Sequence, residues 1–157
     1  MARILIKDLG VRTGKDGKPA HRMQFSYACD QMEIGADVPM ANTFLQTVSH
    51  NKKTGKTYSS RDYYLSDASY ERLMKSVSTE GCEDSRWTGI VEAEVKKVGN
   101  DKGYRHMLQV STAHRPELPF DEARHIAFVK ASQRAAEAES RLPGAVALAD
   151  TEKQFRE

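Results

Sequence analysis

Three lysine-rich turns provide most of the chemistry that this sequence offers. They are residues 12–19 (RTGKDGKP), 50–57 (HNKKTGKT) and 96–105 (KKVGNDKGYR). Each turn contains Gly, Asn or Asp, which tolerate the positive φ angles of tight β-hairpins. Cations projecting from several hairpin ends of one small sheet would create a focused positive field that attracts a polyanionic strand. The alternative is that the lysines only keep the hairpin ends soluble.

Binding a single strand also requires aromatic rings on which bases stack, each worth about 1–3 kcal/mol. Tyr58 and Tyr64 share a polar strand face with Ser60 and Asp62, so they are the best stacking candidates. Phe44 is a weaker third candidate. Tyr104 starts its strand beside the third turn and is compatible with stacking or with packing.

The predicted nucleic-acid-binding residues are the cations in and beside the three turns, together with three tyrosines. They are Lys15, Lys18, Arg22, Lys52, Lys53, Lys56, Tyr58, Arg61, Tyr64, Lys96, Lys97, Lys102, Tyr104 and Arg105. By contrast, three aromatic residues have the strand parity of aliphatic neighbours and are predicted to be buried: Phe25, Tyr27 and Trp87.

Period-two alternation predicts the strands that carry these residues. We expect strands over residues 3–11, 22–30, 42–50, 57–65, 87–98 and 104–112. They form three hairpins, and a loop over residues 31–42 connects the first hairpin to the second. The alternation over residues 3–11 suits a strand with both faces covered. Ser66 and Asp67 offer an N-cap to a short helix over residues 68–77. The sequence therefore predicts a mainly β protein with one short internal helix.

A long alanine-rich helix is predicted from Asp121 to about Leu142, where Phe120 would pack as a staple at its start. One side carries a stripe of small residues: Ala123, Ala127, Ala131, Ala135 and Ala138. Such a stripe would lie on the sheet of its own chain or contact a second copy. We expect a dimer or tetramer, because linked sites raise avidity for a long strand.

Composition sets limits on these interpretations. The 157 residues suit one domain with a tail, and the net charge of +2 is small because acidic residues gather in residues 80–84, 117–122 and 137–157. The basic character is therefore only local, which argues against strong nonspecific DNA affinity, because the electrostatic contribution grows with the number of phosphates neutralised. Cys29 and Cys82 match no metal or redox spacing and are expected as free thiols. With no long apolar run, the chain is expected to be soluble and cytoplasmic.

Enzymatic function has no support in the sequence. There is no phosphate-binding loop, no zinc-protease motif and no nucleophile elbow. The histidines lack ligand spacing, so neither a metal nor a cofactor is expected: they are His21, His50, His106, His114 and His125. Glu92 and Glu94 share a strand face within reach of a divalent ion, but cross-strand ion pairs explain them more simply.

Residues 59–66 (SSRDYYLS), the short helix, Gly81 and residues 87–95 (WTGIVEAEV) together resemble single-stranded DNA-binding proteins of the bacterial and phage type. The resemblance spans about residues 2–114. It implies an OB-fold barrel that binds single-stranded DNA with little sequence preference, in phage or bacterial replication or recombination. That family usually ends in an acidic tail with an Asp-Pro-Phe tip that recruits partners. Residues 150–157 (DTEKQFRE) lack the proline, which puts recruitment of replication proteins in doubt.

We therefore expect an OB-like domain over residues 1–114, a helix over residues 115–142 and a flexible tail over residues 143–157. The alternative function is a protein-interaction module, for example a host-protein inhibitor, built on the same small barrel or on the final helix. A third is recognition of double-stranded DNA or RNA by the same scaffold. Steep loss of affinity with salt distinguishes a strand binder from a protein binder.

Overall fold

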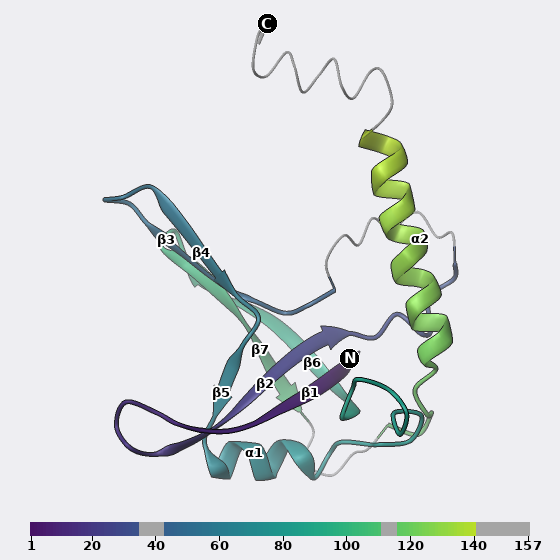
Figure 1. The fold of residues 1–157 in the computed structure, drawn as a ribbon, viewed down its shortest axis with the longest axis horizontal. Helices are drawn as coiled ribbons and strands as arrows, with labels where there is room; N and C mark the ends of the chain where they lie inside the picture. Colours follow the sequence, from purple (N-terminus) through teal and green to yellow (C-terminus); the bar gives the residue numbers. More distant parts are fainter. Residues whose placement is uncertain (35–42, 111–115, 141–157) are drawn as a thin grey trace, which may run out of the picture. The chain divides into compact units, whose positions relative to one another are not determined.

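A computed structural model shows a mainly β chain with a short internal helix and a longer helix near its C-terminal end (Figure 1), as predicted. It describes residues 1–34, 43–110 and 116–140. Residues 1–28 and 43–122 form one compact unit, which holds every described strand and the short helix. Residues 29–42 and 123–157 form a second unit, which holds the long helix.

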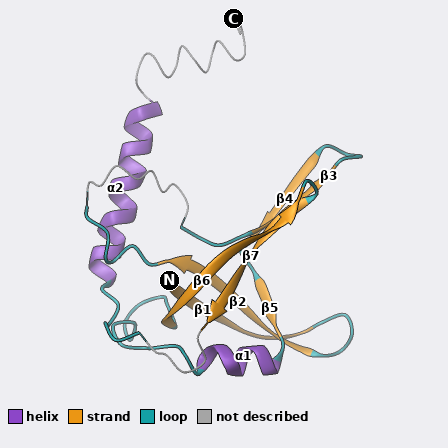
Figure 2. Cartoon of the chain, turned by 180° about the vertical axis from the view of Figure 1, so that it is seen from behind, coloured by secondary structure: helices purple, strands orange, loops and turns teal. Residues whose placement is uncertain are grey.

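The first unit contains one antiparallel sheet (Figure 2). Its strands are β1 (Ala2–Thr13), β2 (Pro19–Tyr27), β3 (Thr47–Asn51), β4 (Lys56–Ser60), β5 (Tyr63–Leu65), β6 (Gly89–Asn100) and β7 (Gly103–Val110). The hydrogen-bonded order is β4-β3-β7-β6-β1-β2-β5. The two edge strands, β4 and β5, are consecutive in the chain. Pairing among the described strands does not show a closed barrel.

The predicted strand over residues 57–65 is broken at Arg61 and Asp62, where the chain changes its pairing partner. Before the break β4 pairs with β3, and after it β5 pairs with β2. The Asp62 amide donates to Ser60 Oγ at 3.1 Å, which turns the chain locally. The strand predicted over residues 42–50 begins only at Thr47, and Phe44 forms a single bridge with Ser26.

Two apolar clusters cover opposite faces of the central strands. The first cluster contains Ile4, Ile6, Met23, Phe25, Leu45, Leu73, Val77, Val91 and Ala93. The second cluster contains Leu5, Cys82, Trp87, Ile90 and Phe120. Three successive β1 side chains are fully buried as a result: Ile4, Leu5 and Ile6. The expectation that both faces of this strand are at least partly covered is confirmed for its first half, whereas Val11 is 60% exposed.

The burial predicted for Trp87 is confirmed, but the strand face predicted for its side chain was wrong. Its side chain lies in the second cluster, whereas Val91 lies in the first. The strand begins only at Gly89, and Thr88 donates its amide to the Ile6 carbonyl at 2.7 Å. Alternation counted through residues outside a strand does not predict a face. Phe25 is buried as predicted, and Tyr27 packs half-buried against the first cluster.

Phe120 belongs to the core of the sheet unit rather than serving as a staple for the long helix. Its side chain is 4% exposed within the second cluster, and its amide donates to the Glu80 carbonyl at 3.0 Å. Gly81 permits this approach, because a Cβ there would lie 2.0 Å from the Phe120 carbonyl oxygen. Phe120 is therefore part of the apolar cover on one face of the sheet.

Helix α1 (Asp67–Met74) begins as predicted, since the Ser66 side chain accepts a hydrogen bond from the Ser69 amide. It ends three residues earlier than the predicted Val77. Val77 turns into the first cluster, and Ser78 forms a bridge with Ile90.

Helix α2 (Glu122–Ser140) confirms the long helix, while its predicted end at Leu142 and the predicted tail lie outside the described residues. Its buried residues are His125, Phe128 and Ser132, and His125 Nδ1 accepts a hydrogen bond from the Cys29 amide at 3.0 Å. Three of the five stripe alanines are exposed instead: Ala123, Ala135 and Ala138.

Cys29 and Cys82 are both buried thiols, as predicted. Burial, with a smaller contribution from Asp30, raises the pKa of the Cys29 thiol to about 11. Across the described ranges, neither helix has the length and apolarity that a membrane span requires.

We predict that Phe120→Ala lowers the free energy of unfolding by about 3–5 kcal/mol, because it empties a position in the second cluster. Urea denaturation measures this change. Leu118→Ala is the matched control, since that side chain is 56% exposed and should cost less than about 0.5 kcal/mol. Equal effects of the two substitutions would contradict the packing of Phe120.

Candidate nucleic-acid interface

Two of the three lysine-rich turns lie side by side. Strand β3 pairs with β7, so the β3–β4 turn meets the β6–β7 turn, and the His50 amide donates to the Lys102 carbonyl at 2.8 Å. Lys52 Nζ also lies 2.6 Å from Asp101 Oδ2. The second and third turns therefore form one cationic end of the sheet.

The first turn projects separately. Both views show the β1–β2 loop and the β3–β4 end of the sheet diverging from the strands between them (Figures 1 and 2). Lys15 and Lys18 are exposed on that loop. The geometry therefore does not favour the expectation that all three turns act together. The sheet brings two turns side by side, and Lys15 and Lys18 lie apart from them.

Gly103 makes the contact between the two joined turns possible. Its φ is +140°, and a Cβ at this position would lie 2.1 Å from the Val48 carbonyl oxygen. Any side chain would force β3 away from β7. The sequence shows the glycine, but it does not show that β3 approaches Gly103 closely.

The strand register sorts the candidate residues onto two faces. Tyr58 lies opposite Ser49, which lies opposite Gly103, and Arg105 is two residues further along the same face of β7. We call the face that carries Tyr58 and Arg105 the outer face. It also carries Lys56 on β4 and Lys96 on β6.

The outer face is open to solvent and cationic. Tyr58 is 56% exposed. Within the described residues, no hydrogen bond or ion pair engages the side chains of Lys56, Lys96 or Arg105. Glu94 and Glu92 follow on the same face of β6 and limit its positive region, and Glu92 lies directly opposite Arg3.

Two apolar side chains on the outer face were missed by the sequence reasoning. Val98 is 44% exposed and Met107 is 40% exposed, and each lies beside a cation of the same face. Val98 pairs with Arg105, and Met107 pairs with Lys96. The two-residue turn at Asp101 and Lys102 fixes this register, so counting back from the turn would have found both.

Lys97 and Tyr104 lie on the opposite, inner face. The Lys97 ammonium lies 3.9 Å from the centroid of the Tyr104 ring, which is half-buried and packs edge-on against His106. A base could stack on Tyr104 only by displacing this cation. Of the two uses considered for Tyr104, the geometry favours packing.

Several predicted binding cations are already engaged by the protein. The Arg22 guanidinium donates to Asp62 at 2.9 Å, and Lys52 pairs with Asp101. Arg61 lies 4.2 Å above the ring of Phe44. Phe44 packs in turn against Trp87, with ring centroids 5.8 Å apart, so it is a poorer stacking platform than its ring alone suggests.

Asp62 anchors the break between β4 and β5. Burial alone would raise the pKa of its carboxyl group. Hydrogen bonds from Gln24 and Arg22, with the charges of Arg22 and Arg12, lower that pKa below its ordinary value. The carboxylate therefore stays ionised and holds Arg22 in place, which leaves Arg22 less available to a phosphate.

The remaining candidates are accessible but less organised. Tyr64 is 57% exposed on β5, opposite Arg22 and apart from the β3–β4 end. Lys53 and Lys102 are exposed in the two joined turns. They extend the positive end of the sheet beyond the outer face.

Comparison with known proteins finds no matching family model, no matching curated protein and no matching solved structure. Among the residues that the structure describes, no three His, Cys, Asp or Glu side chains gather to hold a metal ion.

We predict that Gly103→Ala disrupts the joined turns, because its Cβ would meet the Val48 carbonyl. Hydrogen exchange of the His50 amide, which the Lys102 carbonyl protects, should become faster. Gly55→Ala is the control, since Gly55 also has a positive φ (+70°) but open space around a Cβ. If both variants exchange this amide alike, the close approach does not hold the turns together.

Proposed function

We propose that the outer face binds single-stranded DNA with little sequence preference. The observation that carries the proposal is an exposed ring, Tyr58, on the same strand face as three cations that no described residue pairs: Lys56, Lys96 and Arg105. Stacking on a ring accepts any base, and cations contact the backbone, so this combination favours binding without base readout.

We propose further that the sheet is an OB-type barrel. Its edge strands β4 and β5 are separated only by Arg61 and Asp62, and a short helix lies between β5 and β6. Both features support the resemblance noted above, which extends over the same strands. In such barrels, loops and strand faces bind oligonucleotides. Assembly into a dimer or tetramer remains a prediction.

A protein partner is the second candidate, and a specific observation favours it. Val98 and Met107 add apolar area to the outer face, as an interface between proteins would require. Their neighbours are nevertheless cations. We rank single-stranded DNA first because its bases and phosphates would use both kinds of side chain.

Lys96 and Lys97 provide a matched test, since they are adjacent in the sequence but lie on opposite faces. We predict that Lys96→Glu weakens binding to an oligothymidine and reduces the dependence of affinity on salt, whereas Lys97→Glu has a smaller effect. Fluorescence anisotropy at two salt concentrations measures both. Equal loss in the two variants would contradict the choice of face.

Tyr58→Ala is expected to reduce affinity for the same oligothymidine by about 1–3 kcal/mol, because it removes a stacking platform. Its exposure predicts little change in melting temperature. Tyr58→Phe keeps the ring and should bind almost as well as the unaltered protein. Normal binding by the alanine variant would exclude stacking on this ring.

A further inference from the structure

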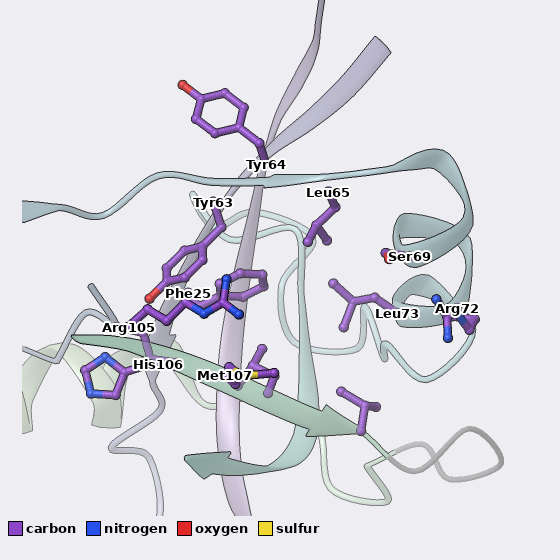
Figure 3. A pocket seen from close by; sticks show the side chains of 13 residues that line it. Phe25, Tyr63, Tyr64, Leu65, Ser69, Arg72, Leu73, Arg105, His106 and Met107 are labelled. Carbon is purple, nitrogen blue, oxygen red and sulfur yellow. The ribbon is translucent and has the colours of Figure 1, made fainter. Parts of the chain in front are cut away.

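A pocket of about 630 Å³ opens between α1, β5 and β7 (Figure 3). Its volume is in the range of small-ligand sites. Much of its lining is apolar and comes from both the sheet and the helix: Phe25, Leu45, Leu65, Leu73, Leu108 and Val110. It lies where β5 and β7 approach without a strand pairing, so it results from the partner change at Asp62.

One buried polar group of the lining has no partner. The Tyr63 hydroxyl is inaccessible to solvent and forms no hydrogen bond with any described residue. Burial is the main cause that raises the pKa of this phenol, whereas the nearby Thr47 side chain and His106 backbone, together with the charge of Arg105, lower it. Neither Thr47 nor His106 reaches hydrogen-bond distance and angle to the hydroxyl group. Buried hydroxyl groups are nearly always hydrogen-bonded, so a rotation of the Tyr63 side chain toward a ligand in the pocket would offer that ligand an unsatisfied donor and acceptor.

The lining also holds two cations. Figure 3 shows Arg105 beside Tyr63 at one end and Arg72 on α1 at the other, with Leu65 and Leu73 between them. No described residue forms an ion pair or hydrogen bond with either guanidinium. Two guanidinium groups across an apolar pocket favour a ligand with a flat apolar centre and negative groups on both sides.

We propose that this pocket takes a single nucleobase, unstacked from a bound DNA strand, with its polar edge at the Tyr63 hydroxyl and its flanking phosphates near Arg72 and Arg105. The proposal rests on the proposed function. Arg105 belongs to both places, because it lies on the outer face and also lines the pocket. A strand on the outer face would therefore bring a nucleotide close to the pocket mouth.

Photo-crosslinking tests the location of the base directly. The probe is an oligothymidine with 5-iododeoxyuridine at one position, irradiated with the full chain and analysed by peptide mass spectrometry. We expect adducts on Tyr63 or Phe25 within the pocket. Adducts confined to Tyr58 would overturn the pocket proposal and leave the outer face intact, whereas an absence of any binding would overturn both.

Substitutions separate recognition from folding. Tyr63→Phe removes only the unpartnered hydroxyl, so the fold should be kept while affinity for the oligothymidine falls about two- to ten-fold. Unchanged affinity of the Tyr63→Phe variant would show that the hydroxyl group does not contact the DNA. Arg72→Gln should weaken binding more than Arg86→Gln, which removes the same charge from an exposed loop residue outside the lining. An equal loss of affinity in the two variants would show that Arg72 is not part of the binding site.

A peptide of alternating Glu and Phe provides the competing probe. If it binds in a way that Arg72→Gln abolishes, while the oligothymidine gives no pocket adduct, the pocket belongs to a protein partner and the nucleobase assignment is wrong. Failure of the peptide to bind, together with pocket adducts, supports a nucleotide.

Discussion

The double-sided burial of β1 and the start of β6 is the constraint on which the other features depend. Leu5 and Ile90 pair with each other within the second cluster, while Ile4 and Val91 pair within the first. Neither face of the sheet is free at this level. The strands extend beyond both clusters toward the β6–β7 turn and toward the β1–β2 turn, and their side chains are exposed there.

Strand β6 shows this gradient within a single element. Its side chains are buried from Gly89 to Val91 and exposed from Lys96 to Asn100. The same alternation that divides the two clusters at its start divides the cations at its end. Consequently Lys96 continues the face of Ile90, and Lys97 continues the face of Val91. The protein thus uses one strand both as core and as surface.

The change of pairing partner at Asp62 has a second structural consequence. Because β4 pairs with β3 but β5 pairs with β2, a space remains between β5 and β7, and α1 closes one side of it. The Asp62 carboxylate stabilises the change through Arg22 and Gln24. The same ion pair that withdraws Arg22 from the candidate interface therefore helps to form the pocket that contains Tyr63.

The sequence alone determined the element types, because alternation, turn residues and the Ser66 cap are local signals. It predicted the mainly β class, the two helices, the burial of Phe25 and the exposure of Tyr58 and Tyr64. The break at Asp62 was not predictable, since its cause is a hydrogen bond to residues about 40 positions away. Pairing between strands that are distant in the sequence could not be predicted either.

Which candidates share a surface was decided only by the tertiary structure. The turn sequences look equivalent, yet β3 pairs with β7 and leaves the β1–β2 turn alone. Likewise, Phe120 has the local pattern of a helix start, and only contact with Gly81 and the second cluster shows that it is core. Local sequence fixes the conformation of a few residues, whereas a binding face depends on the register between strands that are remote in the chain.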